Sequence, residues 1–239
     1  MTWSILARDD EGRFGVAIAS RFFAVGALCI HTRRGIGALS TQALMNPLYG
    51  PQGMQWLAEG LAPQELVRRL SEADAGRAHR QLHVLGRQGA AAAHTGTECI
   101  EWCGHLAGAG FSVAGNMLAG AAVLDATASA YLESAGRPLA ERLTAAMAAG
   151  ESAGGDKRGK QSAALRIHAD EDYPALDLRV DDHAEPILEL RRLYEKSLER
   201  FQPFIACLPG RHDPVGLTDR VQIDAAVARF QQEREGLPR

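Results

Sequence analysis

Two short runs of mainly apolar residues, WSILARD and FGVAIAS, stand on either side of the polar tetrapeptide DEGR at the start of the chain. A turn-forming stretch with a glycine, here Gly12, between two such runs is typical of a β-hairpin. We therefore expect a hairpin whose first strand begins at residue 2. The next stretch, GALCIHTRRGIGALSTQ, has small and β-branched residues around Gly35 and Gly37 and predicts a second pair of strands.

The spacing of apolar residues changes to a helical period from about Gly53. MQWLAEGLAPQELVRRLSEAD predicts two helices, and the second should begin at Pro63 because proline is favoured in the first turn of a helix. Later, AVLDATASAYLESAG and PLAERLTAAMAAG predict a second helical pair, in which glycine closes each helix. Between the pairs, QLHVLGRQGAAAAHTG predicts a hairpin that turns at RQG, and GFSVAGNML predicts a short strand or a loop.

The last third of the chain continues with strands and then helices. SAALRIHA and DLRVD predict strands, PILELRRLYEKSLERFQ predicts a helix from near Pro186, and TDRVQIDAAVARFQQERE predicts a final helix. This order of elements predicts an α+β sandwich, with two sheets packed together and covered by helical layers. We expect this domain to span residues 1–202, and residues 203–239 to form a loop and helix of unknown role.

Composition limits the classes of partner that this protein is expected to bind. The chain has 239 residues, 46% of them hydrophobic, and a formal net charge of -3, so it carries no basic footprint for nucleic acid or for an anionic membrane surface. It contains neither an apolar run of the ~20 residues that span a bilayer nor a secretory signal pattern, and we expect a cytoplasmic protein. Its four cysteines are too few and too irregularly spaced for a disulfide scaffold.

A glycine-rich stretch, ESAGGDKRGKQSAAL at residues 151–165, is the most conspicuous internal segment. Its glycines allow main-chain amides to approach a ligand, and Asp156 and Arg158 place opposite charges beside them. This pattern predicts either an oxyanion or anion site, or a solvated turn before the strand SAALRIHA. The stretch is not a P-loop, because the G-x-x-x-x-G-K-[ST] spacing is missing.

Two other clusters contain metal-ligating residue types. HTGTECIEWCGH holds His94, Cys99, Cys103 and His105, which is the ligand set of a structural zinc site without its usual spacing. Buried thiols and hydrogen-bonded histidines are therefore the favoured interpretation.

RVDDHAEP places Asp181, Asp182 and His183 at the end of a strand. These residues either orient a base or hold a metal, or they form a polar strand end that caps the following helix.

Several of these stretches together resemble a known family. MTWSILARD, GVAIASRFFAVGAL, GIGALSTQALMNPLYGPQGMQWLAEG, HRQLHVL, HTGTECIEWCGH, GNMLAG, AGGDKRGKQSAAL and DLRVDDHAEPILELRRLY resemble, in this order, the family called domain of unknown function 1028. The resemblance covers about residues 1 to 195. It implies membership of the N-terminal nucleophile (Ntn) hydrolase-like group and a four-layer αββα sandwich of antiparallel sheets.

The resemblance also implies a candidate nucleophile. Ntn hydrolases cleave amide bonds with an N-terminal Thr, Ser or Cys, and Thr2 matches that position. In this sequence only Met1 precedes Thr2, and we expect routine removal of the initiator methionine to expose it. The free α-amine, with a reference pKa of ~7.7–8.0, can then accept the hydroxyl proton as Oγ1 attacks a carbonyl carbon.

Other residues are assigned roles around this nucleophile. Backbone amides of the glycine-rich stretch or the side chain of Asn116 are candidate oxyanion donors, and Arg21 would favour the neutral amine. The alternatives are that Arg21 is an ordinary surface charge and Asn116 a turn residue. Asp156 is a further catalytic candidate. The candidates for substrate binding are Arg158, Asp181 and His183.

The main hypothesis is an amidohydrolase that cleaves a small amide, a ureido compound or a short peptide through an acyl-Thr2 intermediate, with no cofactor and no metal. Its rival is a non-catalytic binding or assembly protein built on the same sandwich. A third alternative is a metal-dependent hydrolase that uses one of the two clusters above. The leucine-rich stripe in LELRRLYEKSLERF is compatible with a homodimer, although such stripes more often pack in the core.

Overall fold

The computed structural model describes residues 2–236. Contacts within the chain divide it into two compact units, residues 1–190 and residues 191–239. The first unit contains both sheets and four of the helices that pack on them. The expected boundary after residue 202 stays a prediction, because compactness alone does not show where an independently folding domain ends.

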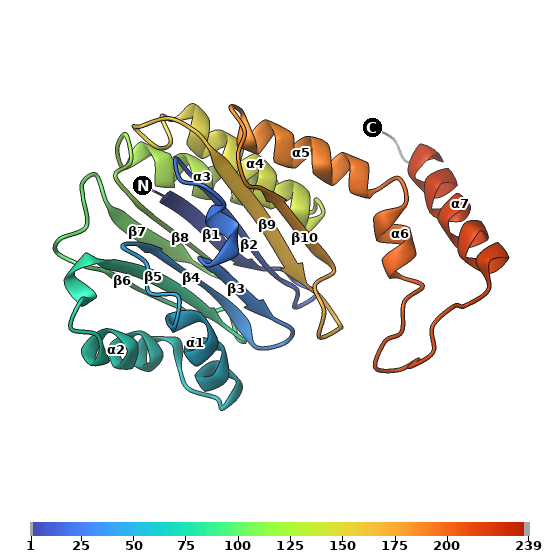
Figure 1. Ribbon diagram of the computed structural model, residues 1–239, viewed down its shortest axis with the longest axis horizontal. Coiled ribbons are helices and arrows are strands. Elements are labelled where there is room, and N and C mark those ends of the chain that lie inside the picture. Colours follow the sequence, from blue (N-terminus) through green and yellow to red (C-terminus); the bar gives the residue numbers. More distant parts are fainter. Residues whose placement is uncertain (1, 237–239) are drawn as a thin grey trace. The chain divides into compact units, whose positions relative to one another are not determined.

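The larger sheet of the first unit has six antiparallel strands (Figure 1). In spatial order they are β10 (Leu176–Val180), β9 (Ser162–His168), β2 (Phe14–Ser20), β1 (Thr2–Arg8), β8 (Phe111–Asn116) and β7 (Gly104–Gly108). The first strand of the chain therefore lies in the interior of the sheet, with hydrogen-bonded neighbours on both sides.

The smaller sheet has four antiparallel strands. In spatial order they are β3 (Ile30–Arg33), β4 (Gly37–Ala43), β5 (Arg80–Gly86) and β6 (Ala91–Thr95). Short 3-10 turns precede β3 and β5, at η1 (Val25–Ala27) and η2 (Arg77–His79).

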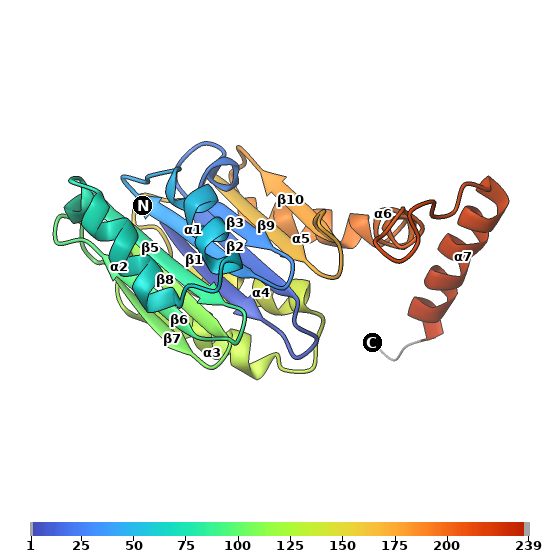
Figure 2. The same cartoon turned by 90° about the horizontal axis from the view of Figure 1, so that it is seen from below.

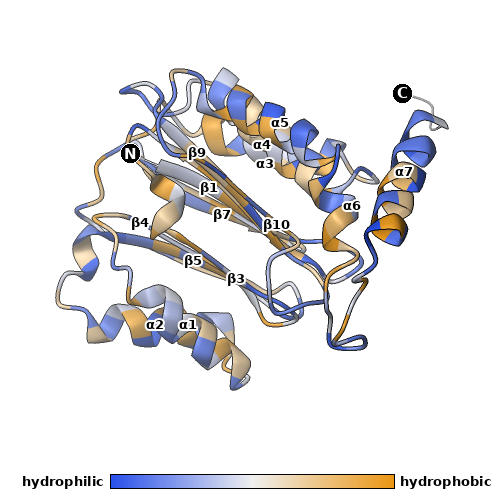
Figure 3. Cartoon of the chain, turned by 45° about the vertical axis from the view of Figure 1, so that its right-hand side comes forward, coloured by the Kyte–Doolittle hydropathy of each residue, from blue (hydrophilic) through white to orange (hydrophobic). Residues whose placement is uncertain are grey.

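Helices cover the outer face of each sheet. α1 (Tyr49–Ala58) and α2 (Pro63–Ala73) lie on the four-stranded sheet, and α3 (Ala122–Glu133) and α4 (Leu139–Ser152) lie on the six-stranded sheet. Figure 3 shows the resulting order of helices, sheet, sheet and helices, and Figure 2 shows the same layers from below. The expected αββα sandwich of two antiparallel sheets is confirmed.

Individual elements follow the sequence closely. The first hairpin begins at Thr2, and α2 begins at Pro63 after an extended Ala62, both as expected. α1 begins at Tyr49, four residues earlier than the apolar spacing indicates, because Asn46 accepts hydrogen bonds from the amides of Leu48 and Tyr49 and starts the turn there. For the segment GFSVAGNML we expected either a short strand or a loop. It contains strand β8, whose residues are all buried.

The remaining helices are α5 (Pro186–Ser197), α6 (Phe201–Ile205) and α7 (Arg220–Gly236). Leu190 of the leucine-rich stripe is buried, whereas Leu188 is exposed. The second unit, which holds α6 and α7, has an ion pair between Arg200 and Asp224 at 2.8 Å. Within residues 2–236, no helix has both the length and the apolar character needed to cross a membrane.

The layer between the two sheets changes character along the strands. At one end it is apolar, with Leu6, Phe14, Val16, Ile18, Ala38 and Leu85 in contact. Toward the end where β1 begins, polar residues take the inward positions. We call this group the polar seam; its members are Ser4, Ser40, Gln42, Gln81, His83, Ser112 and Asn116, each at most 1% exposed.

Hydrogen bonds within the polar seam join the two sheets. Ser4 Oγ of β1 donates to Gln42 Oε1 of β4 at 2.8 Å, and it lies 2.8 Å from His83 Nε2 of β5. His83 Nδ1 lies 3.0 Å from Ser112 Oγ, so both ring nitrogens are hydrogen-bonded to hydroxyl groups of the seam. The seam thereby holds the imidazole ring on both sides and sets the position of β1 against the second sheet.

Burial, together with the nearby His105, lowers the pKa of His83 to about 3. Below pH ~6.5 the unfolded chain binds a proton at this site that the folded chain excludes, so stability should fall as the pH drops from 6.5 toward 3. Between pH 6.5 and pH 5 we expect this group alone to remove about 2 kcal/mol of the free energy of unfolding, measured by urea denaturation.

The variant His83→Gln should lose less of its free energy of unfolding over the same pH interval. His79→Gln, which changes an exposed histidine, should lose as much as the wild type. Equal pH dependence in the two variants would contradict a neutral, buried His83.

Candidate functional site

Thr2 is the first residue of β1 and pairs in register with Ser20 of β2 and Asn116 of β8. Its side chain faces the layer between the sheets, and the residue as a whole is 7% exposed. Thr2 Oγ1 donates a hydrogen bond to Ser20 Oγ at 3.1 Å. Because β1 has a hydrogen-bonded strand on each side, the Thr2 hydroxyl has a fixed position at the polar end of the sandwich.

Asn116 lies at the end of β8, and its side chain joins the polar seam. Asn116 Nδ2 donates to Gln81 Oε1 at 3.0 Å, and Gln42 Nε2 donates to the same oxygen at 2.8 Å. Gln81 Nε2 in turn contacts the carbonyl of Gly115 at 2.9 Å. The seam thus orients the amide group beside Thr2, and the second N–H of Asn116 is available for another acceptor.

Sequence reasoning missed Gln81. The signal that could have found it is in β5, where Gln81 and His83 occupy alternate positions ahead of the apolar Leu85. Polar residues at the inward positions of a buried strand must find partners, so this pattern predicts a buried network.

The loop between α4 and β9 brings Asp156 to the same end of the sandwich. Asp156 has a side chain that is 2% exposed, and its carboxylate accepts from the backbone amides of Arg21 and Arg158, each at 2.8 Å. The Arg158 guanidinium pairs with the same carboxylate at 3.2 Å. A backbone bridge between Asp156 and Leu118 ties the loop to the residues after β8.

Arg21 follows Ser20 directly and lies against this loop. Its Nη1 donates to the carbonyl of Arg158 at 3.1 Å. Gly159 has φ +109°, a backbone conformation that favours glycine, and a Cβ at this position would lie 3.0 Å from Arg21 Nη1. The glycine-rich stretch, Asp156, Arg158 and Arg21 are therefore brought together beside Thr2 and Asn116.

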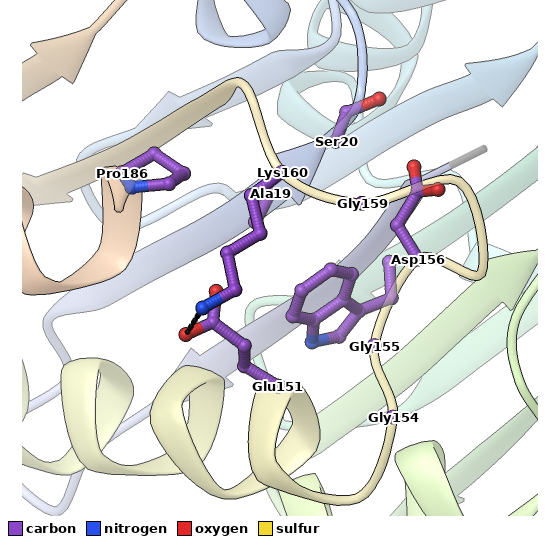
Figure 4. A pocket seen from close by; sticks show the side chains of 10 residues that line it. Ala19, Ser20, Glu151, Gly154, Gly155, Asp156, Gly159, Lys160 and Pro186 are labelled. Carbon is purple, nitrogen blue, oxygen red and sulfur yellow. Dashed lines mark ion pairs between the residues drawn. The ribbon is translucent and has the colours of Figure 1, made fainter. Parts of the chain in front are cut away.

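A small cavity of about 150 Å³ opens beside this group (Figure 4). Its lining residues are Trp3, Ala19, Ser20, Glu151, Gly154, Gly155, Asp156, Gly159, Lys160 and Pro186. Lys160 Nζ pairs with Glu151 Oε2 at 3.1 Å, shown as a dashed line in Figure 4, and with Glu185 Oε2 at 2.5 Å. Ser20 lines the cavity, and its Oγ accepts the hydrogen bond from the Thr2 hydroxyl.

Asp181 and His183 make other contacts. The Asp181 carboxylate pairs with Arg179 at 2.7 Å, and His183 Nδ1 accepts from the backbone amide of Glu185 at 3.0 Å. Across residues 2–236, the hydrogen bonds and ion pairs that we identify do not join either side chain to Thr2. Their assignment to substrate binding stays a prediction.

The segment with two cysteines and two histidines makes local hydrogen bonds. His94 Nε2 donates to the carbonyl of Arg77 at 2.8 Å, and His105 Nδ1 lies 3.2 Å from Thr95 Oγ1. Burial raises the pKa of both the Cys99 and Cys103 thiols. In the described part of the chain, no group of three His, Cys, Asp or Glu side chains is arranged to hold a metal ion.

Comparison with known proteins identifies the family. The model of a family of unknown function, DUF1028, matches residues 2–190, and the chain belongs to this family. Its structure is similar to the crystal structure of protein SPO2555 from Silicibacter pomeroyi, assigned to the same family. The identity is 33%, the TM-score is 0.85, and the match covers 92% of this chain and 96% of that one.

A more distant similarity is to Anbu (ancestral beta-subunit) from Yersinia bercovieri, with 14% identity, a TM-score of 0.37, and coverage of 87% of this chain and 98% of that one. A search of curated proteins gives no match.

Asp156 should control the order of the glycine-rich loop. In Asp156→Ala the amides of Arg21 and Arg158 lose a charged acceptor, which should cost about 2 kcal/mol of local stability. We expect hydrogen exchange in residues 154–160 to become at least tenfold faster, as measured by mass spectrometry.

Asp182→Ala removes an exposed carboxylate from a nearby segment and serves as the matched control. Equal exchange in the two variants would show that Asp156 does not hold the loop.

Proposed function

We propose that this protein is an N-terminal nucleophile amidohydrolase that uses Thr2 as its nucleophile after removal of Met1. Met1 itself lies outside the described residues. The observation that carries the proposal is the place of Thr2: a buried hydroxyl on the first residue of an interior strand, with Ser20 and Asn116 as its register partners. Routine removal of one residue would put an α-amine on the carbon that bears this side chain.

The reaction begins with transfer of the Oγ1 proton of Thr2 to its own α-amine, which has a reference pKa of ~7.7–8.0. Oγ1 then forms a bond to the carbonyl carbon of the substrate. The carbon–nitrogen bond of the amide breaks, and the leaving nitrogen takes the proton from the α-ammonium. Water, deprotonated by the same amine, attacks the carbonyl carbon of the acyl-Thr2 ester. The bond between this carbon and Oγ1 then breaks, the α-ammonium returns the proton to Oγ1, and the acid is released. This sequence uses no metal and no cofactor.

Asn116 is the proposed oxyanion donor. One N–H of its side-chain amide donates to Gln81, and this bond fixes the direction of the second N–H. Asn116 pairs in register with Thr2 on the neighbouring strand. A donor held in place before the reaction stabilises developing negative charge without reorganising. Backbone amides of residues 154–160 are the alternative donors.

Arg21 and Asp156 have supporting roles in this proposal. A cation near the amine favours its neutral form, and Arg21 lies one residue beyond the partner of Thr2. Asp156 binds the Arg21 amide and thereby positions that residue. Arg158 is a candidate to bind a substrate carboxylate, because its guanidinium lies at the same loop. A homodimer stays a prediction.

The proposal predicts that Thr2→Ala lowers turnover of a responsive amide, found by screening small amides, ureido compounds and dipeptides, by at least about 10³-fold. Thr2→Ser should keep measurable activity, since it retains both the hydroxyl and the amine. Thr32→Ala is the matched control, because Thr32 is also a buried strand threonine but bonds His168 instead.

Full activity in Thr2→Ala would refute the nucleophile assignment. Absence of turnover by the wild-type protein across the panel, with Met1 retained, would favour the binding or assembly scaffold.

A further inference from the structure

The cavity beside Thr2 is lined by two buried polar atoms that have no hydrogen-bond partner within residues 2–236. Trp3 is 2% exposed, and its indole Nε1 is one of them; Glu151 Oε1 is the other. One atom is a donor and the other an acceptor. Since buried polar groups in folded proteins are almost always paired, two unpaired atoms in the lining of one cavity require an explanation.

Two glycines allow the backbone to approach the indole ring of Trp3 closely. A Cβ on Gly150 would lie 2.9 Å from Trp3 Nε1, and a Cβ on Gly155 would lie 3.3 Å from the indole six-membered ring. Thr127 Oγ1 of α3 donates to the carbonyl of Val123 at 2.7 Å and does not accept a hydrogen bond from Trp3 Nε1. The helix and the loop therefore approach the ring closely without supplying an acceptor for its N–H.

Glu151 has a charged partner at one of its two carboxylate oxygens. Its Oε2 pairs with Lys160 at 3.1 Å (Figure 4), and Lys160 also pairs with Glu185. These hydrogen bonds raise the pKa of Lys160, so the ammonium stays charged. The remaining oxygen, Oε1, still needs a hydrogen-bond donor. A neutral group with an N–H satisfies it.

Size restricts the occupant further. A volume of about 150 Å³ corresponds to roughly five water molecules at their share of liquid volume, ~30 Å³ each. A terminal carboxamide or ureido group with one or two carbon atoms fits this space. Such a group carries a carbonyl acceptor beside N–H donors, the complement of Trp3 and Glu151.

We propose that this cavity is a recognition subsite for a carboxamide or ureido group of the substrate. The carbonyl oxygen accepts from Trp3 Nε1, and an N–H donates to Glu151 Oε1. Trp3 follows Thr2 directly in β1, so the two side chains face opposite sides of the sheet, and Ser20, which lines the cavity and accepts the hydrogen bond of Thr2, connects the two sides. The substrate assignment rests on the proposed function, whereas binding of the group itself does not require catalysis.

The test follows the indole N–H signals of the three tryptophans by NMR in ¹⁵N-labelled protein, with Trp3 assigned from Trp3→Phe. Propionamide and methylurea are the probes. Butanone, which has the carbonyl without the N–H, and propionate, which is charged, are the control solutes. We expect the two probes to shift the Trp3 signal downfield and saturably at millimolar concentrations, and the control solutes to bind at least tenfold more weakly.

Variants separate this proposal from its alternatives. Glu151→Met should weaken binding of both probes at least tenfold, while Glu151→Gln, which keeps a side-chain carbonyl, should lose less. Trp56→Phe removes an indole from α1 and should bind as the wild type does. Thr2→Ala should also keep binding, which distinguishes failure of the subsite from failure of the proposed hydrolysis.

An unchanged Trp3 signal with both probes would overturn the proposal, and the cavity would then be a site for water only. Equal shifts with butanone would also overturn it, since recognition would not depend on the N–H. Binding of the probes by a protein that shows no turnover would leave the subsite in place and remove the hydrolase proposal.

Discussion

The hydrogen bonds of the polar seam are the constraint on which the rest of this structure depends. Polar side chains enclosed between two sheets cost free energy unless each one finds a partner, and in a medium of low dielectric their hydrogen bonds are correspondingly strong. Ser4 on β1 is bound across the gap to Gln42 and His83 on the other sheet. A shift of β1 by one residue would put apolar side chains in these positions and leave the partners unpaired. The seam therefore specifies the register that places Thr2.

The seam also makes the two ends of the sandwich unequal. One end is filled by aliphatic and aromatic side chains and provides the hydrophobic stabilisation of the layer. The other end gives up part of that stabilisation to hold a hydroxyl, an amide and a buried carboxylate in fixed directions. Such a loss of stability is usual at preorganised sites, and the proposed function uses this end of the sandwich.

Local patterns were sufficient for most of the fold. The hairpin that starts at Thr2 and the helix that starts at Pro63 depend on signals within a few residues, so the sequence contains them directly. The pairing of Asn116 with Gln81, and the common cavity of Trp3 and Glu151, join residues far apart in the chain. Such contacts depend on which strands become neighbours, and single-sequence periodicity does not carry that information. The glycine-rich stretch was an intermediate case: its composition predicted either an anion site or a solvated turn, and its contact with Arg21 came only from the fold.

The central claim is that Thr2 becomes the first residue and acts as the nucleophile. The most direct measurement is to treat the protein purified from its native host with an electrophilic amide analogue and to locate the adduct by fragmentation mass spectrometry. The account predicts that Met1 is absent and that a single adduct lies on the side-chain oxygen of Thr2. An adduct on any other residue, or Met1 retained in every molecule, would contradict it.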